Sequence, residues 1–416
     1  MTMSWSDLGK IAPHTKNVFE ALSKLPASPV IDEIPKYLGI VDCRLDNQAW
    51  SIEMDRVDEV SGTSNRELLL RYLLTRAIVD QGSDIEGVEI WHSKLLEDCY
   101  SAGFRVLHEP SSFVQNYQEI IEFGAKARDH VVATRAKIWA SQKEPGKRSV
   151  NSYTPFNVDG YRGSKQTHWF ISGRLFPALM LATSYPGGLL QLCFKNMVSE
   201  TPLQMSRRIR NDKVYGLGYC IGDKACDLFC KWAIGTYRLT VGISSAWMPA
   251  DSPIPMDQRI GRLMIRTGFM DEFFGVSRMM SKSRFGFLPT DNQLRPAEGS
   301  SLIPSGRWFL KVKDFRRNAK VQKSLTSEWL EQEWRVSGAT GKCPKFGPQE
   351  VVNILCKSMN RELGTEVTSV EIDDQFMRLG GNICTDDNPK CQDCDLRELC
   401  QANTDLSQIN LKSCYT

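Results

Sequence analysis

Apolar residues recur at helical spacing through most of the chain. The clearest run follows Ser64, a residue type that favours helix N-caps, and its apolar side chains stand three and four positions apart at Leu68, Leu69, Tyr72, Leu73 and Ile78. Similar spacing returns in residues 90–100, 113–142, 170–183 and 189–205. No alternating strand pattern of any length competes with these runs, so the sequence predicts a mainly α fold.

A further helix start is marked by Pro253 and Pro255, which stand directly before Asp257 and an amphipathic run that ends at residue 267. The carboxylate of an N-cap aspartate accepts hydrogen bonds from the exposed N–H groups of the first helical turn. The sequence therefore predicts a helix with Asp257 at its N-cap. Residues 146–166, rich in Gly, Ser, Pro and charge, are predicted to form a long loop or insertion.

The amino-acid composition indicates which class of protein this is. The chain has 416 residues, 41% of them hydrophobic and 24% charged, which is typical of a globular protein and excludes disordered and fibrous classes. No apolar run approaches the roughly 18 residues of a membrane-spanning helix. The polar start MTMSWSDLGK lacks the apolar core of a signal peptide, so we expect an intracellular protein of the cytoplasm, nucleoid or nucleus. Its cysteines are then free thiols or metal ligands.

Basic residues are concentrated in three runs, although the formal net charge is only +3. These runs cover residues 143–148, 207–213 and 307–323, and the last alternates with Trp308, Phe309 and Phe315. A single run of this kind is as well explained by a solvated face. Three together favour a phosphate-binding surface.

Four cysteines near the C-terminus have the spacing of a metal site. Cys384, Cys391, Cys394 and Cys400 follow the pattern C-x6-C-x2-C-x5-C. Four thiolates so close in sequence can hold one tetrahedral metal ion or one cubane cluster. Structural zinc is the alternative to an iron–sulfur cluster. It is the less favoured of the two, because only Cys391 and Cys394 form the short knuckle that zinc sites usually repeat.

The cysteine spacing carries a family resemblance. With a Gly pair before Cys384, Pro389 before Cys391 and Leu396 after Cys394, it resembles the iron–sulfur loop of endonuclease III and the adenine glycosylases. These enzymes belong to the helix-hairpin-helix DNA glycosylase superfamily. The resemblance implies a [4Fe-4S] cluster held by the four cysteines in a structural loop, and double-stranded DNA with a damaged or modified base as the partner.

Removing a base from deoxyribose requires stabilisation of a sugar cation, and an amine can add to C1′ to form a Schiff base. The resemblance assigns the amine to Lys224, within Ile221-Gly222-Asp223-Lys224-Ala225, and the carboxylate to Asp257. The element around Asp257 also resembles archaeal 8-oxoguanine DNA glycosylases. Taken alone, Lys224 would be read as a phosphate contact and Asp257 as a helix cap.

The register of the hairpin has two possible readings. Gly216-Leu217-Gly218 is the better Gly-x-Gly match and would place Cys220 in the lysine position, whereas the Gly222 register favours Lys224. In either register, backbone N–H groups of Gly216, Leu217, Gly218 and Gly222 are predicted to bind a DNA phosphate.

Base excision also requires the target nucleotide to be flipped out of the stack. The resemblance suggests that Gln81 fills the vacated space. Three aromatic residues are candidates for stacking on the flipped base, although core packing is the commoner role of such residues: Trp91, Trp169 and Phe170.

The resemblance implies two helical domains with DNA in the cleft between them. We expect an N-terminal extension (1–61), a helical barrel (62–250) with a hairpin (214–232), and a second domain (251–416). The second domain would comprise the Asp257 helix, a basic segment (277–345) and the cluster domain (346–416).

The predicted function is that of a monomeric DNA glycosylase with lyase activity. Three alternatives remain open. They are a monofunctional glycosylase in which Asp257 activates water, a non-catalytic DNA-binding relative, and a hydrolase of modified nucleosides.

Overall fold

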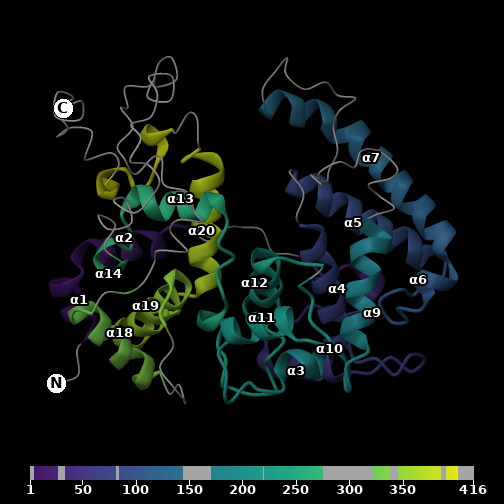
Figure 1. Cartoon of the computed structure of the whole chain (residues 1–416), viewed down its shortest axis with the longest axis horizontal. Helices are drawn as coiled ribbons and strands as arrows, with labels where there is room; N and C mark the ends of the chain where they lie inside the picture. The colour runs from purple at the N-terminus through teal and green to yellow at the C-terminus, as the bar shows by residue number, and fades with distance from the viewer. Residues whose placement is uncertain are drawn as a thin grey trace. The chain divides into compact units, whose positions relative to one another are not determined.

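The computed structural model describes residues 4–26, 33–80, 84–143, 170–218, 220–274, 321, 323–337, 345–385 and 390–401 (Figure 1). In these ranges the regular elements are helices, and the one β contact is an isolated bridge between Val57 and Ser64. The predicted mainly α class is therefore confirmed. Several predicted features lie outside the described residues: Gln81, Trp169, the insertion 146–166 and most of the basic segment 277–345.

The chain divides into two compact units, each with its own hydrophobic core. The central unit is Asp32–Met248, and the terminal unit combines Met1–Ile31 with Pro249–Thr416. The expected boundary between residues 250 and 251 lies two residues from the observed one.

Residues 1–61 do not form the separate extension that the sequence suggested, because each of the two cores contains some of their apolar side chains. Trp5 and Phe19 lie in the core of the terminal unit, and Trp50 and Met54 lie in that of the central unit.

The central unit is built around α4 (Asn65–Val79), whose residues are buried on every side. Ser64 caps it by accepting a hydrogen bond from the N–H of Glu67, as the sequence predicts. The helices and helical turns that contact α4 are α3 (Asn47–Asp55), α5 (Ile85–Ser101), η3 (Ile171–Leu175), α9 (Phe176–Thr183), α10 (Gly188–Phe194), α12 (Asp223–Lys231) and η4 (Trp232–Thr236). A helix surrounded in this way is the natural centre of an all-α core.

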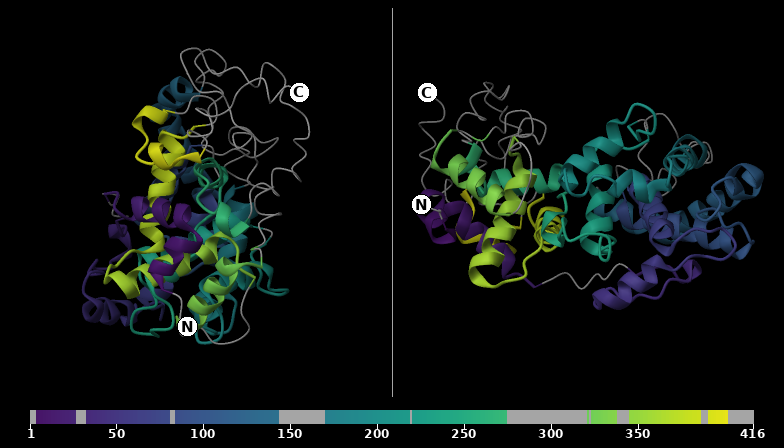
Figure 2. Two further views of the ribbon diagram at one scale, coloured as in Figure 1. Left: turned by 90° about the vertical axis from the view of Figure 1, so that its left-hand side faces the viewer. Right: turned by 90° about the horizontal axis from the view of Figure 1, so that it is seen from below.

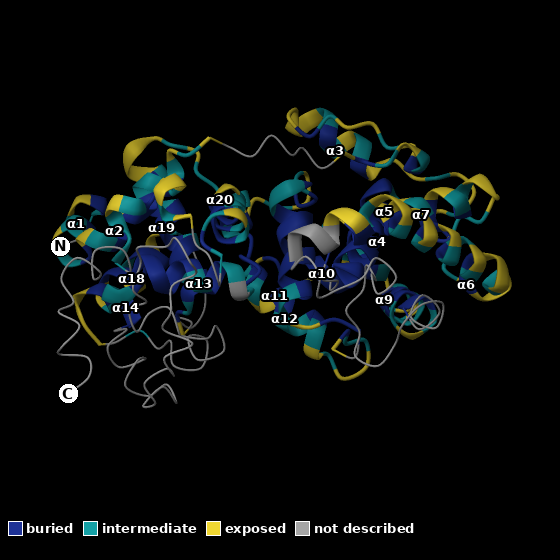
Figure 3. Cartoon of the chain, turned by 90° about the horizontal axis from the view of Figure 1, so that it is seen from above, coloured by how far each residue is buried: buried dark blue, intermediate teal, exposed yellow. Residues whose placement is uncertain are grey.

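Other elements of the central unit are η1 (Lys36–Leu38), α6 (Ser112–Gln115), α7 (Tyr117–Lys143) and α11 (Pro202–Asn211). Helix α7 packs along α5 and combines a buried stripe with an exposed face (Figure 3). The run 189–205, predicted as one helix, is instead α10 and the start of α11. Thr201 and Gln204 form a capping box that begins the new helix at Pro202.

A buried carboxylate joins α4 to α10. Glu67 accepts hydrogen bonds from the N–H groups of Leu189 (3.1 Å) and Leu190 (2.6 Å) and pairs with Arg71 at 2.8 Å. These N–H groups belong to the first turn of α10, where no preceding carbonyl can accept from them. Gly188 is required beside them: its φ is +74°, and a Cβ there would lie 2.9 Å from the Glu67 carboxylate.

Buried histidines make the central unit sensitive to acid. Burial lowers the pKa of His92 from 6.5 to about 3, and that of His108 from 6.5 to about 4, with arginine charges adding to both effects. His92 is hydrogen-bonded to the Thr75 hydroxyl at 2.9 Å. The unfolded chain binds these protons near pH 6.5 and the folded chain does not, so stability is fully present above that pH and is lost as the pH falls below it.

We expect the His92 contribution to lower the free energy of unfolding by about 2 kcal/mol between about pH 6.5 and pH 5, at roughly 1.4 kcal/mol per pH unit. His92→Gln keeps a polar partner for Thr75 but does not titrate. Denaturant unfolding of the variant should therefore show a smaller loss of stability over this range than the wild type. An equal loss in both proteins would contradict this assignment.

The terminal unit packs N-terminal helices against C-terminal ones (Figure 2). Its helices and helical turns are α1 (Trp5–Ile11), α2 (Pro13–Ser23), η5 (Pro249–Asp251), α13 (Gln258–Thr267), α14 (Asp271–Phe274), α18 (Leu325–Val336), α19 (Pro348–Leu363), α20 (Ser369–Asn382), η7 (Cys391–Asp393) and η8 (Arg397–Leu399). Helix α1 contacts α18 and α19, and α2 contacts α20.

Two contacts fix the helices of the terminal unit. The Glu272 carboxylate accepts from the N–H groups of His14 (3.2 Å) and Thr15 (2.8 Å) and so caps α2. Helix α13 packs closely on α20 at Gly380, where a Cβ would lie 2.8 Å from the carbonyl oxygen of Arg259. None of the helices in the described part of the chain has the length and apolar character needed to cross a membrane.

Candidate active site and candidate metal centre

Lys224 lies in the first turn of α12 and contacts a buried carboxylate. Its Nζ donates to Asp80 Oδ2 at 3.2 Å, and the two side chains are 32% and 7% exposed. Asp80 is the C-cap of α4, so the contact joins the end of one buried helix to the start of another. The amine is therefore held by a buried carboxylate, on a side chain that is one-third exposed to solvent.

Cys220, the other candidate for the lysine position, lies in a different environment. It is 6% exposed, and burial raises the pKa of its thiol. Its carbonyl accepts a hydrogen bond from Arg174 at 3.1 Å. A buried, protonated thiol is a poor nucleophile. The exposure of the two side chains thus favours the register that selects Lys224.

The hairpin loop (residues 212–222) joins α11 to α12, which pack on each other. Leu217 N–H donates to the Ile209 carbonyl (3.1 Å), and Gly218 N–H donates to the Arg210 carbonyl (3.0 Å). These contacts satisfy carbonyls at the end of α11, which have no partner within their own helix. The predicted phosphate contacts of Leu217 and Gly218 through these N–H groups therefore do not fit the structure.

The two other hairpin glycines have different surroundings. A Cβ at Gly216 would lie 2.0 Å from the carbonyl oxygen of Asp212, so the close approach of two backbones requires glycine there. Gly222 is the N-cap of α12, and a Cβ there would meet nothing within 4 Å. Phosphate binding by Gly216 and Gly222 stays a prediction.

Arginines of the run 207–213 are engaged within the protein. Arg207 pairs with the buried Asp227 at 2.8 Å, Arg208 hydrogen-bonds Glu200 at 3.0 Å, and Arg210 pairs with Asp223 at 3.2 Å. Since nearby carboxylates neutralise these three charges, the structure does not support the predicted phosphate-binding role of the arginines. Lys213 in the same run is exposed.

Two of the candidate stacking residues belong to the core. Trp91 is 0% exposed and Phe170 is 1% exposed. Their rings meet edge to face at 6.2 Å, and the Trp91 indole N–H donates to the carbonyl of Gly124. Core packing accounts for the presence of both aromatic side chains, and neither ring is exposed for stacking on a flipped base. This candidate role is therefore wrong for Trp91 and Phe170.

Asp257 caps α13, as the proline-rich start of this helix predicts. Its Oδ1 accepts from the N–H groups of Arg259 (2.8 Å) and Ile260 (3.0 Å). The side chain is half-buried. Both bonds use the same oxygen of the carboxylate, so neither of them occupies its second oxygen. Lys224 belongs to the central unit and Asp257 to the terminal unit.

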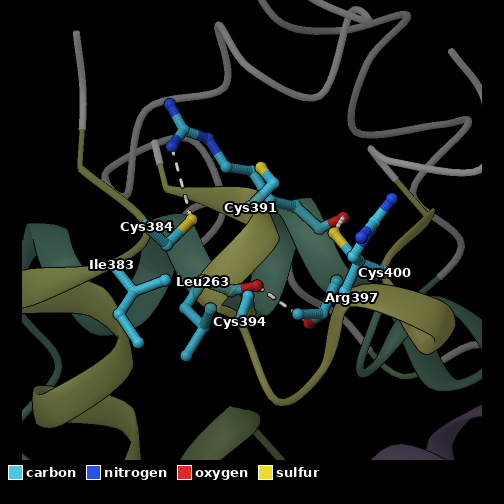
Figure 4. A pocket seen from close by; sticks show the side chains of 9 residues that line it. Leu263, Ile383, Cys384, Cys391, Cys394, Arg397 and Cys400 are labelled. Carbon is cyan, nitrogen blue, oxygen red and sulfur yellow. Dashed lines mark hydrogen bonds between the residues drawn. The ribbon is translucent and has the colours of Figure 1, made fainter. Parts of the chain in front are cut away.

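The four predicted metal ligands lie around one hollow (Figure 4). Its empty space is about 360 Å³, including the part that opens to solvent. Besides Cys384, Cys391, Cys394 and Cys400, it is lined by Leu263, Arg266, Thr267, Ile383 and Arg397. The spacing pattern thus identifies four residues that the fold brings to the same place.

The donor set of the hollow fits an anionic metal–thiolate centre. Arg266, 2% exposed, donates to Cys384 Sγ at 3.3 Å and to the Thr385 carbonyl at 2.7 Å. A buried guanidinium is stabilised by negative charge, which metal-bound thiolates would supply. Leu263 and Ile383 add apolar surface.

The four thiols line the hollow, but they are not arranged with the geometry of a metal site. Among the described residues, no group of three or more His, Cys, Asp or Glu side chains has the arrangement of a formed metal site. Burial raises the pKa of the Cys394 thiol to about 11 and also raises that of Cys391. Metal binding deprotonates such thiols and pulls them toward the metal, so ligand geometry and metal binding form together.

Replacing Arg266 should weaken metal retention. Arg266→Gln removes the charge beside Cys384, and the loss of such an outer partner typically costs about 10–100-fold in metal affinity. The measurement is the rate at which a chelator removes iron from the purified protein. Arg361→Gln is the control, because Arg361 pairs with Glu333 in the same unit and does not line the hollow. Equal rates in both variants would contradict a role for Arg266.

Comparisons of the chain with protein-family models, curated proteins and solved structures find no match. The candidate sites therefore rest on the residues themselves. Sequence reasoning missed Asp80 and Arg266, which contact Lys224 and Cys384. The sequence contains a signal for Asp80, because an acidic residue is unfavourable at the negative C-terminal end of a predicted helix.

Proposed function

We propose that this protein is an iron–sulfur DNA glycosylase with lyase activity, which removes a damaged or modified base from double-stranded DNA. The observation that carries the proposal is the position of Lys224. Its side chain is one-third exposed and lies in the first turn of α12, and the carboxylate of Asp80 holds its amine at 3.2 Å. A Schiff-base enzyme needs an amine that is positioned by the protein and open to the substrate.

In this proposal Lys224 forms a bond to C1′ of a nucleotide flipped out of the duplex, and the bond from C1′ to the base breaks. The base leaves with the electron pair. Positive charge develops on the sugar in this step, and the carboxylate of Asp257 stabilises it. The hydrogen bonds to Arg259 and Ile260 orient that carboxylate before the substrate binds.

Cys384, Cys391, Cys394 and Cys400 would hold a [4Fe-4S] cluster. When bound, the cluster supplies covalent links among four points of the C-terminal segment and a centre capable of electron transfer. Arg262 and Arg266 reach this segment from α13: Arg262 donates to the Cys384 carbonyl at 2.6 Å. The segment thereby supports the helix that Asp257 begins.

A strand-incision assay tests the function. The purified protein is incubated with duplexes that each carry one damaged or modified base, and base release and strand cleavage are measured separately. We expect one or a few duplexes to lose the base and be nicked at that position. Absence of release from every duplex, from single strands and from free modified nucleosides would contradict the proposal.

The ion pair also supports a second candidate, a monofunctional glycosylase. In that enzyme Lys224 stays an ammonium ion paired with Asp80, and Asp257 activates a water molecule. It would release the base without cutting the strand. The same assay distinguishes the two, because only the lyase nicks the DNA without added alkali.

A further inference from the structure

We propose that Asp80 is the proton acceptor for Lys224, an inference that rests on the proposed lyase function. The Asp80 carboxylate is 7% exposed, and its Oδ2 lies 3.2 Å from Lys224 Nζ, within reach for direct proton transfer. Lys224 is 32% exposed. The side chain of Lys224 therefore contacts the carboxylate through its amine and is also partly open to solvent.

The place of Asp80 in its helix favours a functional role. It is the C-cap of α4, and its backbone N–H completes the helix by donating to the Arg76 carbonyl at 3.1 Å. The C-terminus of a helix is its negative end, where a carboxylate is unfavourable. Asn would suit this position better, so helix formation alone does not explain an aspartate. The contact with the ammonium group of Lys224 gives a reason for an aspartate at this position.

Neighbouring charged groups also have partners. Arg76, one turn earlier on α4, pairs with Glu89 at 2.7 Å and lies over the Trp232 ring. On α12, Asp223 pairs with Arg210 at 3.2 Å. Arg174 donates to the Cys220 carbonyl. The contact with Asp80 is thus one of several charge contacts in this part of the central unit.

The proton balance can be written for an abasic site. Lys224 gives one proton to Asp80, and its nitrogen lone pair forms a bond to C1′ of the open-chain aldehyde, whose oxygen takes a second proton from nitrogen. Asp80 then returns its proton to that hydroxyl group, which leaves as water while the C=N bond forms. The product is an iminium ion on Lys224, one water molecule and a carboxylate restored on Asp80.

Asp80→Asn tests this role, since it keeps the shape and suits the C-cap but cannot accept the proton. Initial rates of borohydride-trapped adduct are measured on duplex DNA with an abasic site, at protein concentrations that saturate binding. We expect a fall of about 100-fold or more, typical of losing a general base, with unchanged DNA affinity. Asp80→Glu should restore part of the rate. Asp84→Asn is the matched control, because Asp84 is equally buried and pairs with Arg135 at 3.0 Å.

A second measurement needs no DNA. Reductive methylation with formaldehyde and cyanoborohydride, read by mass spectrometry, reports how readily Lys224 reacts, with the exposed Lys213 as internal reference. Asp80→Asn should raise Lys224 labelling several-fold, because the ammonium form loses its partner. Unchanged labelling would mean that the pair does not exist in solution and would overturn the proposal.

The two measurements together separate the possible roles of Asp80. A proton acceptor predicts more labelling and slower trapping in Asp80→Asn. A mere charge partner predicts that both increase, and that result overturns the proposal. If wild-type protein traps no DNA although labelling responds to Asp80→Asn, the proposed function fails. The pair then remains as a charge contact without the proton-transfer role.

Discussion

Replacing Asp257 with asparagine is expected to slow base release by about 100- to 1,000-fold, the typical effect of removing one group that stabilises transition-state charge. Asparagine caps helices about as well as aspartate, so α13 should keep its start at Gln258. The substitution therefore removes the charge that we propose stabilises the sugar cation, and it retains the helix cap. The measurement is the single-turnover rate of base release with enzyme in excess over duplex DNA.

The chain offers a matched control for this prediction. Asp46 caps α3 with the same geometry, accepting from the N–H groups of Gln48 (2.9 Å) and Ala49 (3.1 Å) through Oδ1. Asp46→Asn should leave the rate within about two-fold of the wild type, since surface substitutions rarely disturb a distant site. If Asp257→Asn also retains a near wild-type rate, Asp257 is only a helix cap.

Replacing Cys394 with alanine is expected to abolish binding of the proposed iron–sulfur cluster. Three remaining thiols cannot complete a four-thiolate site, so we expect iron to fall from about four atoms per chain to near zero. Cys394 packs against the core of the terminal unit. The free energy of binding a structural metal contributes to the folding free energy of the protein. The variant should therefore also unfold at a lower temperature.

Iron, zinc and acid-labile sulfide are measured in the purified protein, together with visible absorbance. Cys356→Ala is the control: Cys356 is buried in the same unit but does not line the hollow. It should lose stability and keep its iron. One zinc ion per chain without sulfide would identify the alternative structural zinc site. Retention of a full cluster by Cys394→Ala would contradict the ligand assignment.

Local sequence signals predicted much of this fold. Helical periodicity identified the segment that forms α4, and Ser64 identified its N-cap. The prolines before Asp257 identified the start of α13, and cysteine spacing identified the residues that line the hollow. Each of these signals depends on neighbouring residues in the chain. For this reason they could be read without knowledge of tertiary contacts.

Long-range contacts could not be read in the same way. The N–H groups of Leu217 and Gly218 are used by α11, and Arg207 is neutralised by Asp227, twenty residues later. The first helices join the terminal unit because Trp5 and its neighbours complete a core formed mainly by residues after 249. The contact between Asp80 and Lys224 spans 144 residues. No local pattern specifies such pairings.

The most direct test of the account is borohydride trapping of the purified protein on duplex DNA that carries an abasic site or a damaged or modified base. We expect a covalent protein–DNA adduct that is lost in Lys224→Ala, because the proposed Schiff base forms on that amine. Lys231→Ala, on the same helix, should retain it if the variant folds. An adduct that persists in Lys224→Ala, or its absence from wild-type protein on every duplex, would contradict the account.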